Sequence, residues 1–330
     1  MNAPARLRQL GVFLAVFLSL HTLGQADSQD KGPQGYVFTI NEENDKFVTP
    51  STDKHYTQGL HLLLLWPDDE VPMVFQPLAL APDFGIAGAT RKFGFAIGQN
   101  IYTPTDTQAT SLIVTDRPYA GWLYLGLVRE VRGTSARGIP TFEHLELDLG
   151  VIGSDSLAHE AQAWFHQVVG DKPPEGWKHQ LHNEPAVLIV DDRRWLFWEN
   201  QANDGFKIQL IPKASLKLGN VETSAKIGAM MRLGHHIADE FSKTMERRVG
   251  WYAFSEIDAR SVLHNAFLDG NLITDSPSVA KEPGVAELHI GVGFTFKQVE
   301  FRYTYNYLTR EFKLQDKYDA YGSFDLICRF

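Results

Sequence analysis

The chain has 330 residues, of which 44% are hydrophobic and 22% charged, and its formal net charge is −9. This acidic balance argues against a nucleic-acid partner, because such binding depends on basic contacts to phosphate. The single cysteine, Cys328, excludes a framework of internal disulfides. Beyond residue 25, no run approaches the roughly 18 apolar residues that a membrane-spanning helix needs. If the chain crosses a membrane, we therefore expect a closed β-barrel.

The first residues follow the pattern of a secretion signal. Arg6 and Arg8 form a basic start, residues 10–20 are apolar, and residues 24–26 (Gly-Gln-Ala) supply small side chains before a cut. The alternative is a buried core helix. We expect cleavage of residues 1–26 and a single domain over residues 27–330. An exported chain without disulfides is expected in the periplasm or the outer membrane.

Alternating hydrophobicity predicts β-strands along most of the chain. Near the end, Phe324, Leu326, Cys328 and Phe330 share one face, and a last strand that ends in an aromatic residue is typical of outer-membrane barrels. Further strands are expected over 36–41, 58–66, 92–99, 121–131, 141–150, 205–218, 222–233, 251–263, 285–297 and 299–308. The prediction is an all-β protein, a transmembrane antiparallel β-barrel of about 12 strands. A soluble β-sandwich is the alternative.

Residues 154–169 break this pattern, because they show no alternation and are dense in helix formers. Ser154 or Asp155 can cap a helix there, and Gly170 can end it. Gln162 and His166 lie four residues apart, so a helix places them on one face. We expect a short helix in a segment that connects two strands.

Three clusters hold residues that could carry chemistry. Asn44 and Asp45, followed by Thr57, offer oxygen ligands of the kind that a hard cation such as calcium prefers. Residues 116–124 read DRPYAGWLY, and His166 supplies an imidazole, the usual general base near neutral pH. Taken one at a time, the clusters are also explained as residues of turns or of the protein surface without a function in catalysis. The sequence has no GxSxG elbow, HExxH motif or P-loop, which leaves a serine or thermolysin-like hydrolase without support.

Taken together, the clusters resemble the outer-membrane lipid A 3′-O-deacylase family. The motifs that carry the resemblance are, in chain order, residues 44–47 (NDKF), 56–59 (YTQG), 99–104 (QNIYTP), 116–124 (DRPYAGWLY), 150–153 (GVIG), Gln162 with His166, Gly170 and 174–181 (PEGWKHQL). The resemblance is strongest over residues 38–184. It implies a 12-stranded barrel in the outer membrane of a Gram-negative bacterium, with a site near the outer leaflet. The implied activity is calcium-dependent hydrolysis of the 3′ acyl ester of lipid A.

The resemblance also implies roles for single residues. His166 is the expected base that activates water, Gln162 orients the base or the water, and Asn44 lines the site with them. Asp45 and Thr57 are the expected ligands of calcium, which would polarise the ester carbonyl and stabilise the oxyanion.

The sequence departs from the family pattern after the helix. A glutamate is expected two residues after Gly170, and Lys172 stands there. Asp171 or Glu175 is therefore expected to supply the missing carboxylate to the metal.

The expected partners are lipid A in lipopolysaccharide, outer-membrane lipids and the machinery that assembles outer-membrane barrels. Two other functions stay open on the sequence: a phospholipase-like outer-membrane esterase, and a porin or structural barrel without enzymatic activity.

Overall fold

A computed structural model describes residues 35–48, 54–68, 72–83, 85–200, 205–238, 240–242 and 248–330. The expected signal peptide, residues 1–26, lies outside the described residues. Within this part of the chain, no helix is long and apolar enough to span a membrane.

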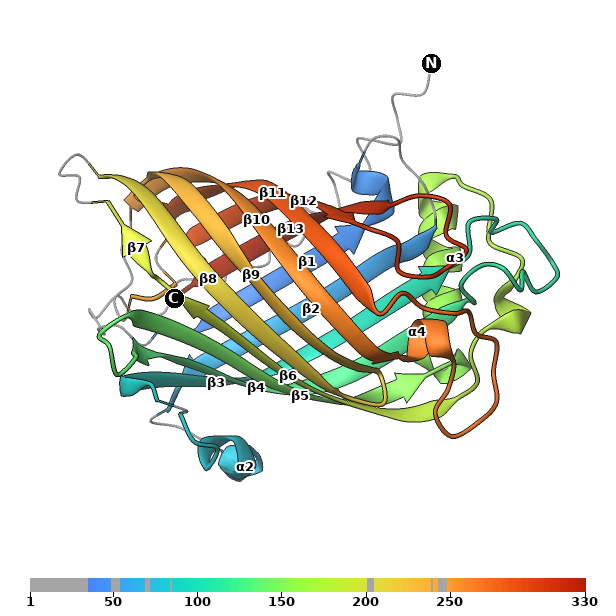
Figure 1. Cartoon of the computed structure of the whole chain (residues 1–330), viewed down its shortest axis with the longest axis horizontal. Helices are drawn as coiled ribbons and strands as arrows, with labels where there is room; N and C mark the ends of the chain where they lie inside the picture. Colours follow the sequence, from blue (N-terminus) through green and yellow to red (C-terminus); the bar gives the residue numbers. More distant parts are fainter. Residues whose placement is uncertain are drawn as a thin grey trace, which may run out of the picture.

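Twelve antiparallel strands of the described chain form a closed barrel (Figure 1), which confirms the predicted fold class. They are β1 (Val37–Asn44), β2 (His55–Pro67), β3 (Ala87–Thr103), β4 (Ala120–Thr134), β5 (Pro140–Ile152), β6 (Glu184–Trp195), β8 (Phe206–Gly219), β9 (Glu222–His235), β10 (Arg248–Asn265), β11 (Gly284–Lys297), β12 (Val299–Leu308) and β13 (Asp319–Arg329). β1 pairs with β13, and β6 pairs with β8, so the sheet has no open edge there. The short β7 (Trp198–Glu199) adds to β8.

Each strand places alternate side chains on the two surfaces of the barrel wall. Exposed apolar side chains stand on the outer surface and include Leu64, Phe95, Ile97, Leu125, Leu149, Ile257, Ile290 and Phe294. The inner surface carries buried polar groups such as Glu130, Lys213 and Glu256. This apolar-out, polar-in pattern is that of a barrel in a membrane, and it explains the period of two in the sequence.

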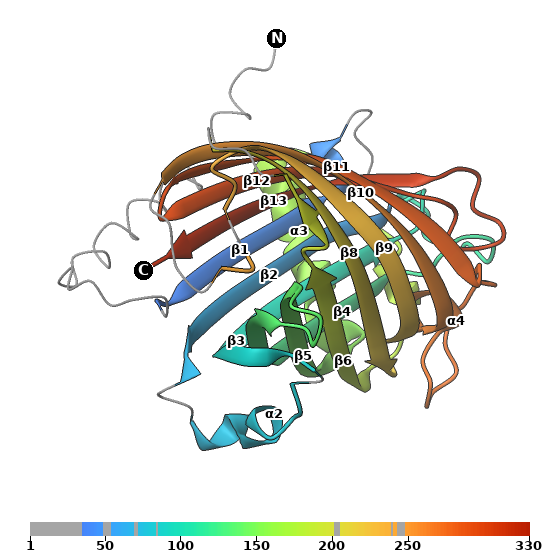
Figure 2. The ribbon, with the colours of Figure 1, turned by 60° about the vertical axis from the view of Figure 1, so that its left-hand side comes forward.

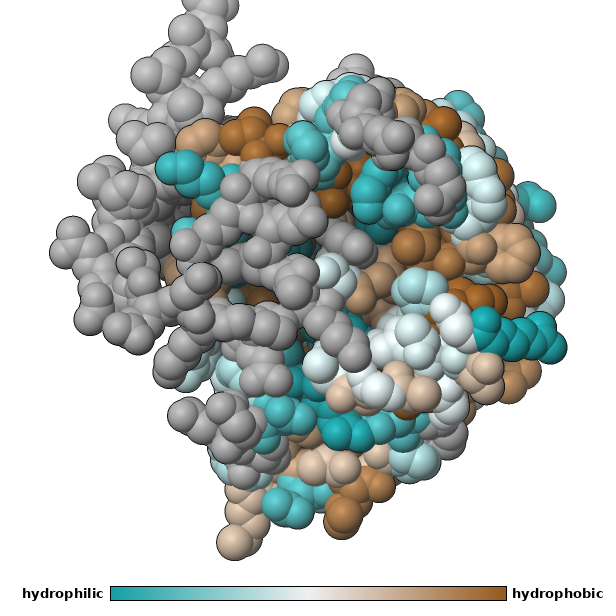
Figure 3. All heavy atoms as spheres, turned by 90° about the vertical axis from the view of Figure 1, so that its left-hand side faces the viewer, coloured by the Kyte–Doolittle hydropathy of each residue, from teal (hydrophilic) through white to brown (hydrophobic). Residues whose placement is uncertain are grey.

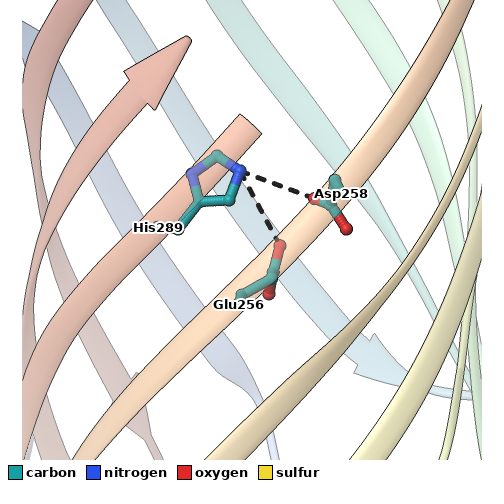
Figure 4. Close-up of side chains that lie close together, drawn as sticks. All are labelled: Glu256, Asp258 and His289. Carbon is teal, nitrogen blue, oxygen red and sulfur yellow. Dashed lines mark ion pairs between the residues drawn. The ribbon is translucent and has the colours of Figure 1, made fainter. Parts of the chain in front are cut away.

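Inside the barrel, charges are balanced by neighbouring strands. Figure 4 shows His289 of β11 facing Glu256 and Asp258 of β10, with its Nε2 atom 3.5 Å from Asp258 Oδ2. The three side chains could hold a metal ion. However, Lys213 pairs with both carboxylates, and Lys226 lies 3.6 Å from Asp258. We therefore interpret the cluster as a structural ion-pair network.

The two ends of the barrel differ. At the end that holds Phe330, β11 and β12 are joined by Gln298 alone, and β4 and β5 by residues 135–139. Figure 3 looks onto this end and shows hydrophobic side chains around much of the uncovered rim. The opposite end carries the long connections 104–119, 153–183 and 266–283. The connection 68–86 is also long and lies at the Phe330 end, but most of the long connections, including the longest, are at the opposite end. Short turns face the periplasm in such barrels, so the opposite end is the outer side.

The helices are short and lie in the connections. They are the 3₁₀ turns η1 (Asp45–Phe47), η3 (Met73–Phe75), η4 (Ser154–Ser156) and η5 (Trp177–His179), and the α-helices α2 (Gln76–Ala79), α3 (Ala158–Val169) and α4 (Ala266–Asp269). α3 is the predicted helix, and it lies at the outer end (Figure 1).

Two details of the sequence prediction need correction. Neither Ser154 nor Asp155 caps α3, because the chain first makes η4 and then enters the helix through Leu157 in the left-handed region, at φ 58°. Ser154 instead donates to Asn183 Oδ1. Gly170 ends the helix as expected, at φ 82°. The strand β6 was not predicted at all.

Candidate active site

Four residues that pair across neighbouring strands lie in one row on the lipid-facing surface of the barrel, close to its extracellular end. Asn44 of β1 pairs with Gln58 of β2, Gln58 with Ile101 of β3, and Ile101 with Gly121 of β4. These positions have the parity of the lipid-facing Leu64, Phe95 and Leu125, so their side chains point out of the barrel. The predicted Asn44 therefore lies on the outside of the wall.

A β-bulge in β2 adds Thr57 to this row. The register shifts between Tyr56 and Gln58, so Thr57 is the extra residue. Its hydroxyl lies 2.7 Å from that of Thr103, an outward residue of β3, and both side chains are buried. The chain enters β2 through His55 at φ 62°, which is held there by Asp319, 2.6 Å from its Nδ1 atom. The bulge thus sets a hydroxyl beside Asn44 and Gln58.

α3 covers the row. Ala158 packs against Ile101, and Gln99 donates to the carbonyl oxygen of Ser156 at 2.7 Å. Gly121 lies directly beneath, where a Cβ atom would stand 2.1 Å from Ser156 Oγ and 2.2 Å from Ala158 Cβ. Only glycine allows this approach of the helix to the wall.

The inner face of α3 carries Gln162 and His166, both almost fully buried. Trp177 Nε1 donates to Gln162 Oε1 at 2.9 Å, and the Trp177 ring packs on Tyr119. His166 Nδ1 lies 2.6 Å from the carbonyl oxygen of Lys172. A carbonyl oxygen can only accept, so Nδ1 carries the proton and the lone pair of the neutral ring is on Nε2. This is the tautomer that a general base needs at Nε2.

The second part of the site lies at η1 and contains Asn44 and the carboxylate of Asp45, whereas the first part is the Gln162 and His166 face of α3. Asn44 Oδ1 accepts from the Lys46 N–H at 2.8 Å, and the buried Asp45 accepts from the Lys54 N–H at 2.6 Å. The Lys46 ammonium forms an ion pair with Asp171. The Asp171 N–H in turn donates to the carbonyl oxygen of His166 at 2.9 Å. Lys46 and Asp171 therefore tie η1 to the end of α3 and bring the two parts together.

The predicted metal ligands are only partly assembled. The oxygens of Asn44, Asp45 and Thr57 suit a hard cation chemically. Asp171 is paired with Lys46, the residue that follows Asp45 in η1. Glu175 is exposed, and its backbone N–H donates to Thr107.

Sequence reasoning missed Thr103 and Lys46, although both lie inside motifs that were singled out. The QNIYTP run ends one residue after Thr103, and NDKF contains Lys46. Neither residue type signals its partner, because the partners lie in other connections of the fold.

Comparison with known proteins agrees with this architecture. The family model described as outer membrane protein LpxR matches residues 12–330. The chain belongs to the LpxR family. The family places it in the outer membrane as an integral protein and among enzymes related to lipid A.

A solved structure of LpxR has the same fold as this chain. LpxR from Salmonella typhimurium is 21% identical, with a TM-score of 0.70 over 89% of this chain and 100% of that one. The β domain of the Bordetella autotransporter BrkA is 10% identical and covers 91% of this chain and 98% of its own, with a TM-score of only 0.43. No curated protein sequence matches significantly.

Proposed function

We propose that this LpxR-family chain hydrolyses the 3′ acyl ester of lipid A at the outer leaflet, with His166 as the general base. The observation that carries the proposal is the His166 imidazole, buried between α3 and the lipid-facing wall with Nδ1 bound to a carbonyl oxygen. A base in that position is accessible to substrates that lie in the membrane. A porin conducts solutes through the barrel interior, so it does not need a base on the lipid-facing surface.

The outer face of α3 supports a lipid substrate. Trp164 and Val168, four residues apart, form an apolar stripe on the helix; Leu157 directly precedes the helix, and all three are exposed. The stripe lies roughly opposite Gln162 and His166. Exposed apolar stripes of this kind contact membranes or partners, and this one stands beside the lipid-facing band of the wall. Acyl chains of the outer leaflet can therefore surround the site on both sides.

The reaction follows from the His166 geometry. Nε2 accepts a proton from a water molecule as the water oxygen attacks the ester carbonyl carbon. Gln162, fixed by Trp177, holds the base or the water in line. The carbon–oxygen bond to the sugar then breaks, and the protonated Nε2 returns its proton to the leaving oxygen. The products are a fatty acid and a free hydroxyl on lipid A, with no covalent intermediate.

We further propose that calcium binds between η1 and the end of α3, with Asp45 and Thr57 as ligands and Asp171 or Glu175 as the second carboxylate. When bound, calcium supplies a positive charge that stabilises the oxyanion. The Lys46 ammonium competes with the cation for Asp171, because both need the same carboxylate. This competition gives the chain a weaker calcium site than one with an uncommitted carboxylate.

The test uses the purified, folded protein with lipid A and, separately, with phosphatidylethanolamine. Release of a fatty acid from lipid A alone supports the proposal. Release from the phospholipid alone favours the phospholipase-like alternative. Release from neither, with or without calcium, contradicts both enzyme functions.

A further inference from the structure

The connection between β2 and β3 folds back along the outside of the barrel at its periplasmic end. Figures 1 and 2 show α2 standing beside the wall near β3. Phe75 and Leu78 are buried and pack with Phe93 of β3 and Trp66 of β2. Phe93 and Trp66 have outward parity, so residues 72–83 cover part of the outer surface.

A polar network fixes this segment to the wall. Arg129 of β4, also an outward residue, donates from Nη1 to the carbonyl oxygens of Leu78 at 3.0 Å and Ala81 at 2.5 Å. Its Nη2 lies 2.6 Å from Glu143 Oε1 on β5, and Arg193 of β6 lies 2.9 Å from the same carboxylate. Three neighbouring strands thus carry charged groups on their outer surface: Arg129 and Glu143 are almost fully buried, and Arg193 is partly exposed.

The network marks the depth of the segment in the membrane. Charged side chains on the outer surface of a barrel are costly at the mid-plane of the bilayer and nearly cost-free at its interfaces. The row that contains Arg129, Glu143 and Arg193 therefore lies at headgroup level. Most of the long connections, including the longest, 153–183, are at the other end of the barrel, so this level belongs to the inner leaflet.

The far side of the segment is apolar and uncovered. Met73 is 86% exposed, Leu80 is 80% exposed, and Val74 is also exposed. The segment adjoins the lipid-facing band, because the ring of its Phe75 packs against that of the exposed Phe95, with 5.0 Å between the ring centroids. Apolar side chains at headgroup depth gain free energy by entering the boundary between headgroups and acyl chains.

We propose that residues 72–83 form an interfacial anchor that inserts Met73, Val74 and Leu80 into the inner leaflet of the outer membrane. The partner is a phospholipid surface, and the anchor is independent of the proposed hydrolysis. It holds the barrel at a fixed depth on the side of β2 to β5. The candidate active site lies above it, on β1 to β4.

The experiment measures depth by electron paramagnetic resonance. In a Cys328→Ala background, Met73→Cys and Leu80→Cys are each spin-labelled, and the folded protein is placed in vesicles of phosphatidylethanolamine and phosphatidylglycerol. Collision with oxygen reports lipid exposure, and collision with a water-soluble nickel chelate reports water exposure. Leu125→Cys is the lipid-facing control. Ala136→Cys is the water-exposed control, because it lies in the β4–β5 turn at the same end of the barrel.

We expect the spin labels at positions 73 and 80 to collide more often with oxygen than with the nickel chelate, as the label at position 125 does. The label at position 136 is expected to collide more often with the nickel chelate. Nickel collisions at 73 and 80 equal to those at 136 overturn the proposal. Heat-modifiable gel mobility identifies folded samples. If one labelled variant does not fold, a label at Val74→Cys gives the same test.

Discussion

The Nδ1 atom of His166 lies 2.6 Å from the carbonyl oxygen of Lys172, the residue that stands where a metal-binding glutamate is expected. The backbone of Lys172 therefore keeps a role in the site, although its side chain cannot bind calcium. The contact sets the tautomer of the base, and it forms only because Gly170 ends α3 and turns the chain back. The base and the altered metal site are thus linked through one short loop.

The hydrogen bond from Trp177 to Gln162 gives a first prediction. Trp177→Phe removes the indole N–H but keeps an aromatic ring against Tyr119. We expect hydrolysis of lipid A to fall by about 5-fold, as for the loss of one positioning hydrogen bond worth about 1 kcal/mol. The measurement is the rate of fatty-acid release at saturating substrate. An unchanged rate contradicts a positioning role for Gln162.

The close approach at Gly121 gives a second prediction. Gly121→Ala introduces a Cβ atom into Ser156 and Ala158, so α3 must move away from the wall. We expect a folded barrel with at least about 100-fold less activity, because small displacements of a catalytic group are costly. Gly284→Ala is the matched control, since a Cβ atom there meets nothing within 4 Å. Equal activity of the two variants would show that the position of α3 does not matter.

The Lys46–Asp171 ion pair gives a third prediction. Lys46→Gln removes the competing ammonium, so we expect activity to reach half its maximum at a calcium concentration about 10-fold lower, for a coupling of about 1.4 kcal/mol. Chelation of calcium is expected to abolish activity in both proteins. The measurement is a calcium titration of fatty-acid release. Full activity in the presence of a chelator contradicts the metal role altogether.

Asp116, in the 104–119 connection, gives a prediction about pH. Burial raises its pKa, but hydrogen bonds from His55 and from the Thr105 N–H outweigh burial and lower the pKa from 3.8 to about 2. The ionised carboxylate is therefore favoured in the folded protein. Its stabilisation, about 2 kcal/mol, is present above pH 3.8 and is lost as the pH falls through about 2.

We expect Asp116→Asn to unfold at a lower temperature than the original protein near neutral pH, and this difference to shrink as the pH approaches about 2. The transition is followed by heat-modifiable gel mobility. Asp106→Asn is the control, because Asp106 is an exposed residue of the same connection. A difference that does not depend on pH would mean that the carboxylate charge is not responsible.

The sequence predicts most of the barrel because its outward residues alternate with inward ones. β11 and β12 were predicted to within one residue. β6 was missed because the strands were predicted from alternating hydrophobicity. Its second half, Asp191 to Arg194, carries charged side chains on both faces of the strand and has no apolar face. Those charges are stabilised by partners on β5 and by Glu240, and such partners are invisible in a local pattern.

The candidate site was predictable where a motif is local and unpredictable where it depends on register. Gln162 and His166 share a helix, so their spacing reveals their common face. Thr57 reaches the wall beside Asn44 only through a bulge, and no sequence signal marks it. The helix start at Leu157 depends on the contact of η4 with β4, which local capping rules do not contain.

The central claim is tested most directly by mass spectrometry of lipid A treated with the purified original protein and with His166→Ala. Gln167→Ala is the control, because Gln167 is the exposed neighbour on the same helix. We predict loss of one acyl group from lipid A with the original protein and with Gln167→Ala, and intact lipid A with a folded His166→Ala. Loss of the same acyl group with His166→Ala at an undiminished rate would contradict the claim.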